Sequence, residues 1–286
     1  MRAFLSRSLH RYFSFLPPTT RLIVRRRLED AAPALLFHLN AARRHQTQRE
    51  LRACKTVEEY LAFTQRHLGT GSIQRVREIE GALWFLQEEL KDKLPLHVCE
   101  IGTEYGGTNL LLGHALPNVE LLIGVDLWVK HAPQLHAFKP QNQELHLVNG
   151  SSYAHKTVER VAELLNGRLL DVLFIDGDHC YEGVKNDFLL YRQFVREGGF
   201  ILLHDIVPDD KARFGRATTS WAGGVPLLWH RLKAFYSHHE WVQEPQQDGL
   251  GIGALRYDPS IELPDEFTNS HDDDAIYPTL TFEKTV

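Results

Sequence analysis

The chain has 286 residues, of which 43% are hydrophobic and 24% charged, and its formal net charge at pH 7 is -5. These fractions are typical of a globular protein with one substantial core, and the charge balance lacks the basic excess that nucleic-acid binding requires. Cys54, Cys99 and Cys180 have unrelated spacings, which fit neither a disulfide framework nor a zinc site. We therefore expect a cytoplasmic protein in a reducing compartment, with no nucleic-acid partner.

The first 28 residues differ from the rest of the chain. They contain seven arginines and no acidic residue, and the apolar residues of 1–16 fall near one helical face. A basic amphipathic helix of this kind can lie peripherally in a membrane interface or serve as an organellar transit peptide. It can equally pack on the catalytic domain or on a partner subunit. Amphipathicity alone does not separate these alternatives.

Residues 28–94 have a helical pattern. Apolar residues recur at three- and four-residue steps in 57–67 and 73–90, with a glycine-containing break at 69–71. We expect Trp84 to belong to the core of this part. Residues 1–92 are thus predicted to form a helical N-terminal extension, which could also provide the interface of a homo-oligomer. At the other end, residues 259–286 form an acidic tail.

A strand, a crossover helix and a second strand are predicted in residues 172–203. Residues 172–175 and 200–203 are short apolar runs without polar alternation, as in strands that are buried on both faces of a parallel sheet. Residues 181–196 between them have helical spacing, and Gly198-Gly199 predicts a turn. The chain is therefore predicted to contain an α/β domain with a doubly wound, mostly parallel sheet.

Polar side chains follow both of these strands directly. Asp176, Asp178 and His179 come after the first, and His204 and Asp205 come after the second. In a parallel sheet the carboxyl ends of the strands lie at one edge, which is where ligands bind. The sequence therefore predicts a functional site at this edge.

Two further apolar runs predict the ligand-binding half of the sheet. Residues 96–101 are followed by a turn that begins at Gly102, and residues 121–125 end in Asp126, which can accept hydrogen bonds from two ribose hydroxyls. Glu104 replaces the second glycine of the dinucleotide fingerprint. A pyrophosphate would meet the carboxylates of Glu100 and Glu104, so a ligand with a ribose and a cationic or zwitterionic tail fits better. S-adenosylmethionine has both.

These segments resemble the class I S-adenosylmethionine-dependent methyltransferases. The resemblance is to the branch that contains macrocin-type sugar and rhamnosyl O-methyltransferases and cephalosporin hydroxylase-like proteins. It implies a Rossmann-like fold for residues 93–258 and is carried, in order, by residues 100–112, 125–128, 174–188, 198–206, 224–233 and 251–257.

The resemblance also implies roles for residues near the methyl donor. It places Asp126 at the ribose hydroxyls and Ser151 and Ser152 at the adenine, although a Ser-Ser pair after a strand is also a common turn or helix cap. The residues implied around the methionine and ribose portions are Glu100, Gly102 and Gly106.

On the acceptor side, the family pattern places metal ligands at Asp176, His204 and Asp205. Two carboxylates suit Mg²⁺, whereas an imidazole ligand favours Mn²⁺, Fe²⁺ or Zn²⁺. His204 could instead orient a water or a carboxylate. The resemblance further implies that His179 is the general base, since a neutral imidazole can take a proton near pH 7.

The expected activity is a divalent-metal-assisted O-methyl transfer to a hydroxyl of a small molecule, such as a sugar, a glycoside or another natural product. Residues 128–140 and 211–224 are expected to close over this acceptor. One alternative is a cephalosporin hydroxylase-like oxygenase, in which His179, His204 and a carboxylate hold iron. The other is a non-catalytic scaffold that binds the donor.

Overall fold

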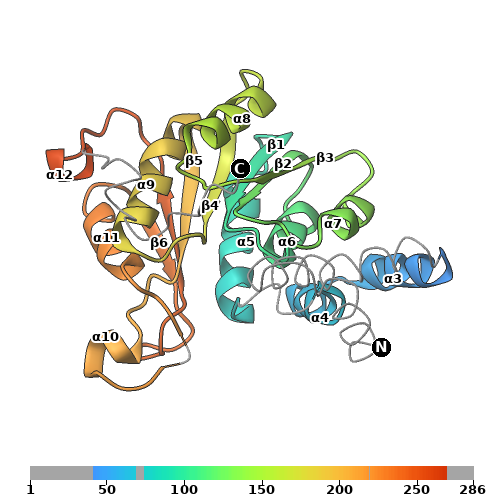
Figure 1. Ribbon diagram of the computed structural model, residues 1–286, viewed down its shortest axis with the longest axis horizontal. Coiled ribbons are helices and arrows are strands. Elements are labelled where there is room, and N and C mark those ends of the chain that lie inside the picture. The colour runs from blue at the N-terminus through green and yellow to red at the C-terminus, as the bar shows by residue number, and fades with distance from the viewer. Residues whose placement is uncertain (1–40, 69–73, 219, 269–286) are drawn as a thin grey trace, which may run out of the picture.

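The computed structural model describes residues 41–68, 74–218 and 220–268 (Figure 1). The predictions for residues 1–28 and for the break at 69–71 lie outside these residues, as does most of the acidic tail.

A seven-stranded sheet forms the centre of the described structure, in the order β3-β2-β1-β4-β5-β7-β6. The pairs among β1 to β5 are parallel, and β7 pairs antiparallel with both β5 and β6. This arrangement confirms the predicted Rossmann-like, mostly parallel sheet. The strands are β1 (Leu96–Ile101), β2 (Val119–Asp126), β3 (Glu144–Asn149), β4 (Leu170–Ile175), β5 (Val195–His204), β6 (His238–Trp241) and β7 (Ile252–Arg256).

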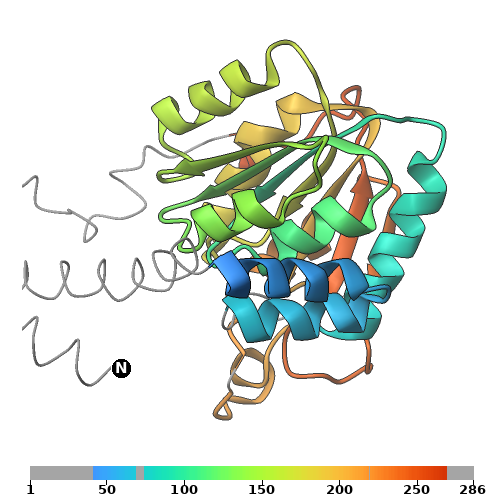
Figure 2. The same ribbon diagram turned by 90° about the vertical axis from the view of Figure 1, so that its right-hand side faces the viewer.

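Helices cover both faces of the sheet (Figure 2). One hydrophobic cluster joins the sheet to α3 (Ala41–Ala53), α4 (Val57–Leu68), α5 (Val76–Leu90), α6 (Gly107–Ala115) and α7 (Ala132–Phe138). The second cluster joins the opposite face to α8 (His155–Leu165), α9 (Tyr181–Tyr191), α11 (Val225–Leu232) and α12 (Asp265–Thr268). The short helix α10 (Asp210–Phe214) follows β5.

The apolar character of β4 explains its central place. All six of its residues are buried. Val172 and Phe174 belong to the first hydrophobic cluster, and Leu173 and Ile175 to the second. Asp171, which pairs with Arg196, is the one polar residue of β4. Successive side chains of a strand point to opposite faces, so the other five positions, which lie between two helical layers, are apolar. Burial of each such side chain contributes about 1.5–3 kcal/mol.

The helical prediction for the N-terminal part is confirmed where the structure describes it, with one correction. Residues 57–67 correspond to α4, and 73–90 correspond to α5, which begins at Val76. Leu86 is fully buried, but Trp84 is 66% exposed, so the prediction that it belongs to the core is wrong. Trp84 lies outside the apolar stripe of α5, whose buried positions include Ile79, Leu83 and Leu86.

The connection between β4 and β5 also differs from the prediction. The crossover helix α9 ends at Tyr191, a 3-10 turn covers Arg192–Phe194, and β5 already begins at Val195. The Gly198-Gly199 pair therefore lies within the strand. It forms a bulge there, because β4 advances from Leu170 to Val172 while β5 advances from Val195 to Phe200. Gly198 has a φ of +71°, which glycine adopts without steric cost.

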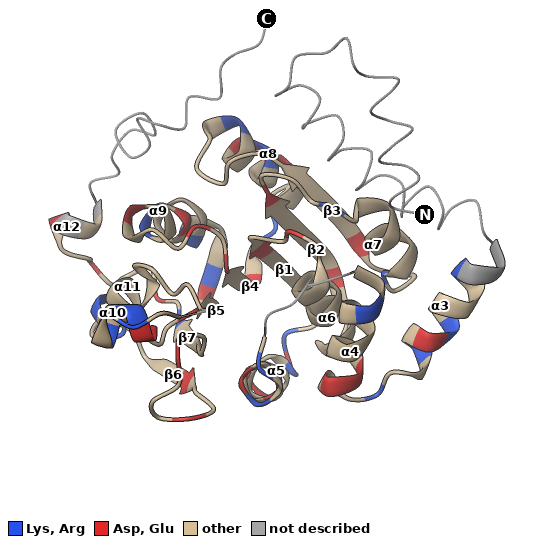
Figure 3. Ribbon diagram, turned by 60° about the horizontal axis from the view of Figure 1, so that its bottom comes forward, with Lys and Arg blue, Asp and Glu red and all other residues tan. Residues whose placement is uncertain are grey.

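Charged residues of both signs are interspersed on the outer elements, as on α3, α5 and α10 (Figure 3). Among the residues described, no helix has the length and hydropathy needed to span a membrane.

Candidate active site

A cavity of about 450 Å³ lies at the carboxyl ends of the parallel strands. It is bounded by the residues that follow β1, β2, β3, β4 and β5, and its centre is where the chain order reverses between β1 and β4. This is the position at which doubly wound sheets bind ligands, and the volume suits a small molecule. Nearly all of the predicted site residues line it, namely Gly102, Asp126, Ser151, Ser152, Asp176, His179, His204 and Asp205.

Gly102 determines how β1 and β4 meet beneath the cavity. Its φ is +93°, and a Cβ atom at this position would lie 1.9 Å from the backbone oxygen of Asp176. The Asp176 amide donates to the backbone oxygen of Ile101 at 2.8 Å. Only glycine permits this approach, so Gly102 places Asp176 at the cavity in addition to lining the cavity itself.

Asp126 is held in a fixed orientation at the end of β2. Its Oδ2 accepts a hydrogen bond from the Glu104 amide at 2.8 Å, and its Oδ1 accepts one from the Trp128 amide at 2.8 Å. Burial raises the pKa of Asp126, although these two hydrogen bonds lower it. A carboxylate offers about four lone-pair sites, so both oxygens can still accept further hydrogen bonds from a ligand.

Two residues that were predicted to contact the methyl donor lie beside the cavity instead of lining it. Glu100 is 1% exposed within β1, and burial raises its pKa to about 8, although the nearby polar side chains of Thr103 and Asn109 act to lower it. Gly106 precedes α6 with a φ of +82°, and a Cβ atom there would meet the side chain of Leu135 at 2.2 Å. Both residues therefore support the turn after β1 without lining the cavity themselves.

The carboxylate of Glu104 has its own partner in the structure. The Nζ atom of Lys130 lies 2.5 Å from Glu104 Oε1 and 4.0 Å from the centre of the Tyr105 ring. Glu104 is thus neutralised locally, and Glu100 does not line the cavity. The expected repulsion between these two carboxylates and a pyrophosphate is consequently weaker than the sequence indicated.

Asp176 and His179 form the first part of the acceptor side. His179 Nδ1 donates to the backbone oxygen of Trp221, which can only accept, so the proton of the neutral ring is on Nδ1. Its Nε2 lies 3.5 Å from Asp176 Oδ1. The nitrogen that can bind a metal or take a proton therefore faces Asp176.

His204 lies between the two carboxylates. Its Nδ1 is 3.2 Å from Asp176 Oδ1 and 3.2 Å from Asp205 Oδ2. Since both oxygens are acceptors, Nδ1 is a donor here, while Nε2 is buried and has no hydrogen-bond partner among the described residues. This geometry favours the second predicted role of His204, in which it orients the carboxylates, over direct metal ligation.

A metal ion fits a neighbouring set of side chains. Asp176, His179 and Asp205 each offer one ligand atom, and these atoms lie within 4.8 Å of one another. Two carboxylates and one imidazole are compatible with Mg²⁺, Mn²⁺ or Fe²⁺. Asp176 and Asp205 are two of the three predicted ligands, and the third side chain within reach in this set is His179 instead of His204.

The charges of this cluster are strongly coupled. Burial alone would raise the pKa of Asp176, but the charge of His204 and the hydrogen bond of His179 outweigh it and lower that pKa. Burial alone would lower the pKa of His179, yet its interactions with Asp176 and Asp205 raise it to about 9. Burial likewise opposes the charged form of His204, whose pKa the same two carboxylates raise well above its ordinary value.

Several residues at or beside the site were not predicted from the sequence. Leu250 lines the cavity, and so does Tyr153, whose hydroxyl donates to Asp178 Oδ2 at 2.7 Å, whereas Trp221, which also lines it, belongs to the segment 211–224 that was expected to close over the acceptor. Gln74, which precedes α5, donates to Asp176 Oδ2 at 3.2 Å. These residues reach the site through tertiary contacts, and no local sequence signal marks them.

Comparisons with known proteins find similarity over part of the chain. A sequence model of the family described as "Methyltransferase domain" matches residues 99–206. An uncharacterized protein of Acanthamoeba polyphaga mimivirus is 35% identical over 126 residues, which are 40% of this chain and 53% of the viral protein. The chain thus matches about half the length of that relative.

Solved structures with similarity include two O-methyltransferases. One is from Bacillus cereus in complex with SAH, with a TM-score of 0.48 and 17% identity. The alignment covers 72% of this chain and 93% of the Bacillus cereus chain. The other is TomG from Streptomyces achromogenes, involved in tomaymycin synthesis and in complex with SAM. It has a TM-score of 0.46 and 15% identity, and the alignment covers 71% of this chain and 90% of the TomG chain.

The family match runs from within β1 to the residues that follow β5, and the cavity lies at the carboxyl ends of β1 to β5. The mostly parallel sheet and its flanking helices are those of the Rossmann-like fold that the resemblance implied. Residues 99–206 thus match a methyltransferase-domain family within a Rossmann-like sheet.

Proposed function

We propose that the protein is an S-adenosylmethionine-dependent O-methyltransferase that methylates a hydroxyl of a small molecule with the help of a divalent metal. One observation carries this proposal. A single cavity contains residues suited to a nucleoside donor, Gly102, Asp126 and Ser151, and a metal-compatible cluster centred on Asp176 and Asp205. The methyl donor and the acceptor molecule could thus meet in this one cavity.

On the donor side, the chain supplies orientation. Asp126 is already fixed by two backbone amides and accepts the ribose hydroxyls with its remaining lone pairs. Gly102 keeps the β1 turn open to the ligand, and Ser151 and Ser152 border the adenine end. Methyl transfer is an in-line displacement, so its rate depends mainly on how well the two reactants are aligned.

On the acceptor side, Asp176 and Asp205 would hold the metal, which when bound would lower the pKa of the acceptor hydroxyl. With the metal held by the two carboxylates alone, its charge would offset theirs and lower the pKa of His179, so that Nε2 could take the hydroxyl proton while Nδ1 donates to the Trp221 backbone oxygen. The acceptor oxygen forms a bond to the methyl carbon as the sulfur–carbon bond breaks, and the sulfur keeps the electron pair. His204 keeps both carboxylates in place by donating from Nδ1.

The mouth of the cavity supports a small acceptor with an apolar face. Two exposed hydrophobic side chains line it, Trp221 at 72% and Leu127 at 69% exposure. The Trp221 ring centre is 6.0 Å from that of His179. A sugar ring or an aromatic natural product can pack on such a surface while its hydroxyl reaches the polar cluster.

The oxygenase alternative gains no comparable support. It requires two imidazole ligands and one carboxylate, whereas the ligand cluster contains the imidazole of His179 together with two carboxylates. His204 directs its Nδ1–H to those carboxylates instead.

The proposal is tested by transfer of a labelled methyl group from S-adenosylmethionine to a panel of sugars, glycosides and phenols, with Mg²⁺ or Mn²⁺ and with a chelator. We expect alkali-stable methyl ethers, turnover that chelation abolishes, and a loss on the order of 10²-fold or more in Asp176→Asn. The matched control is Asp92→Asn, an exposed carboxylate after α5. Labelled product at a full rate in the presence of chelator would contradict the metal-assisted reaction.

A further inference from the structure

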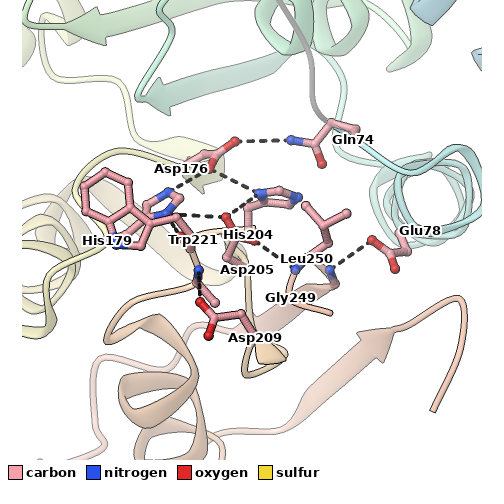
Figure 4. A network of polar contacts seen from close by, with 12 residues as sticks. Gln74, Glu78, Asp176, His179, His204, Asp205, Asp209, Trp221, Gly249 and Leu250 are labelled. Atoms are coloured by element: carbon pink, nitrogen blue, oxygen red, sulfur yellow. Dashed lines mark hydrogen bonds and ion pairs between the residues drawn. The ribbon is translucent and has the colours of Figure 1, made fainter. Parts of the chain in front are cut away.

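The residues around the start of α5 contact the active site although they lie outside residues 99–206, the segment matched by the methyltransferase family. Gln74 is 9% exposed, and its Nε2 donates to Asp176 Oδ2 at 3.2 Å (Figure 4). This contact joins residues 102 positions apart in the sequence. A buried side-chain amide with one bond to a carboxylate is a specific contact, because burial without that bond would be costly.

Glu78, one turn further along α5, binds the loop before β7. It is 1% exposed, and its carboxylate accepts hydrogen bonds from the Gln243 amide at 3.1 Å, from Gln247 Nε2 at 2.7 Å and from the Gly251 amide at 2.9 Å. Three donors satisfy a charge that would otherwise be unfavourable in the interior. The position of this loop therefore depends on Glu78.

The loop in turn binds Asp205. The Leu250 amide, adjacent to Gly251, donates to Asp205 Oδ1 at 2.9 Å (Figure 4). Leu250 has a φ of +62° and Asp205 also has a φ of +62°. Residues with side chains rarely adopt this conformation unless their surroundings impose it. Here the surroundings are the Glu78 carboxylate on one side and the Asp205 carboxylate on the other.

The two metal-binding carboxylates share one pattern of contacts. Asp176 turns Oδ1 toward His179 and His204, and its Oδ2 is held by Gln74. Asp205 turns Oδ2 toward the same two imidazoles, and its Oδ1 is held by the Leu250 amide. In each carboxylate, one oxygen faces the imidazoles and the other accepts a hydrogen bond. For Asp176 the donor is Gln74 itself, and for Asp205 it is the Leu250 amide, whose neighbour Gly251 is bound by Glu78.

We propose that Gln74 and Glu78 are positioning residues of the active site, Gln74 by direct contact with Asp176 and Glu78 through the Gly251–Leu250 turn onto Asp205. The inference rests on the proposed function in that Asp176 and Asp205 are its metal ligands. Groups that orient metal-binding carboxylates typically affect metal affinity 10- to 100-fold when they are removed. The helical part before β1 is then a component of the catalytic centre as well as a cover for the sheet.

The chain offers a matched control for each residue. Gln74→Leu removes the donor to Asp176, whereas Gln87→Leu removes a similar contact of α5, the 2.7 Å bond from Gln87 Nε2 to the Ala115 backbone oxygen, remote from the site. Glu78→Gln turns a side-chain NH₂ toward the Gly251 amide and leaves that amide without an acceptor. Its control is Glu80→Gln, an exposed position on the same helix.

The first readout is binding of Mn²⁺ and of S-adenosylhomocysteine to the full chain by calorimetry. We expect Gln74→Leu and Glu78→Gln to weaken Mn²⁺ binding by about 10-fold or more and to change the affinity for S-adenosylhomocysteine by less than about 2-fold, because Asp126 has no contact with either residue. Neither control should change either affinity. Equal losses of Mn²⁺ affinity in Gln74→Leu and Gln87→Leu would show a merely structural role and overturn the proposal.

The second readout does not depend on a metal. Amide hydrogen exchange at Leu250 and Gly251 should accelerate in Glu78→Gln, and the imidazole NMR signals of His179 and His204 should shift in Gln74→Leu but not in Gln87→Leu. If the wild-type protein binds no Mn²⁺, the proposed role of a metal is wrong. The exchange rates and imidazole signals then still test whether Gln74 and Glu78 position the two carboxylates. Unchanged exchange and unchanged imidazole signals would overturn the inference. If Glu78→Gln does not fold, the Gln74 and Gln87 pair decides alone.

Discussion

Replacement of Gly102 by alanine should damage both the fold and the acceptor side of the site. Gly102 has a φ of +93°, and a Cβ atom there would lie 1.9 Å from the Asp176 backbone oxygen and 2.4 Å from its carbonyl carbon. The left-handed backbone conformation costs an alanine about 1–2 kcal/mol. Relief of the overlap requires β1 and β4 to separate, which adds on the order of 1–3 kcal/mol. The expected loss in the free energy of unfolding is therefore about 2–5 kcal/mol.

Gly167→Ala is the matched control for this variant. Gly167 has a φ of +82°, and a Cβ atom there would have no heavy atom within 4 Å. It should therefore lose the conformational contribution alone, about 1–2 kcal/mol. Only Gly102→Ala has the steric overlap, and only this variant should displace Asp176.

Urea denaturation and thermal melting measure the two losses. For a domain of this size, each kcal/mol lowers Tm by about 2–4 °C, so Gly102→Ala should melt roughly 4–20 °C below the wild type. Mn²⁺ binding to the folded variant should also weaken, whereas in Gly167→Ala it should remain at the wild-type level. Equal destabilisation of the two variants, with metal binding intact in both, would refute the role assigned to Gly102.

Two further predictions concern the buried carboxyl group and the cavity mouth. Burial raises the folded-state pKa of Glu100 to about 8, so its contribution to stability is fully present below about pH 4.5 and is lost as the pH rises toward 8, at about 1.4 kcal/mol per pH unit. The urea midpoint of Glu100→Gln should accordingly fall less between pH 6 and pH 9 than that of the wild type, and an identical fall would contradict this. Trp221→Ala should raise KM for the acceptor by about 10-fold with a smaller effect on kcat, whereas Trp84→Ala, at another exposed tryptophan, should leave both unchanged in steady-state kinetics.

The strands and the edge of the sheet that carries the site could be predicted from the sequence. Strands buried on both faces are largely apolar, so the unbroken apolar run 172–175 stands out, and the polar residues that follow such strands meet at one edge of the parallel sheet. This placed Asp176, His179 and Asp205 correctly at one cavity. Sequence periodicity was less informative for Trp84, because an aromatic residue next to an apolar stripe is not always part of it.

Other features depend on tertiary contacts and atomic orientation. The Gly198-Gly199 pair has the composition of a turn, and only the pairing of β5 with β4 shows that it is a bulge within the strand. The sequence could not show which nitrogen of His204 faces the carboxylates. Nor could it show that Gln74 contacts Asp176 across 102 positions of sequence. Contacts of this range have no periodic or local signature.

The central claim is that one cavity binds a nucleoside methyl donor and a divalent metal through separate sets of residues. Calorimetric titration of S-adenosylhomocysteine and of Mn²⁺ into the wild type, Asp126→Ala and Asp176→Asn tests it most directly. We expect Asp126→Ala to lose at least about 10-fold in affinity for S-adenosylhomocysteine, since hydrogen bonds to a charged group contribute about 1.5–3 kcal/mol, and to keep its Mn²⁺ affinity. Asp176→Asn should show the reverse. Wild-type affinity for S-adenosylhomocysteine in Asp126→Ala, or wild-type affinity for Mn²⁺ in Asp176→Asn, would contradict the account.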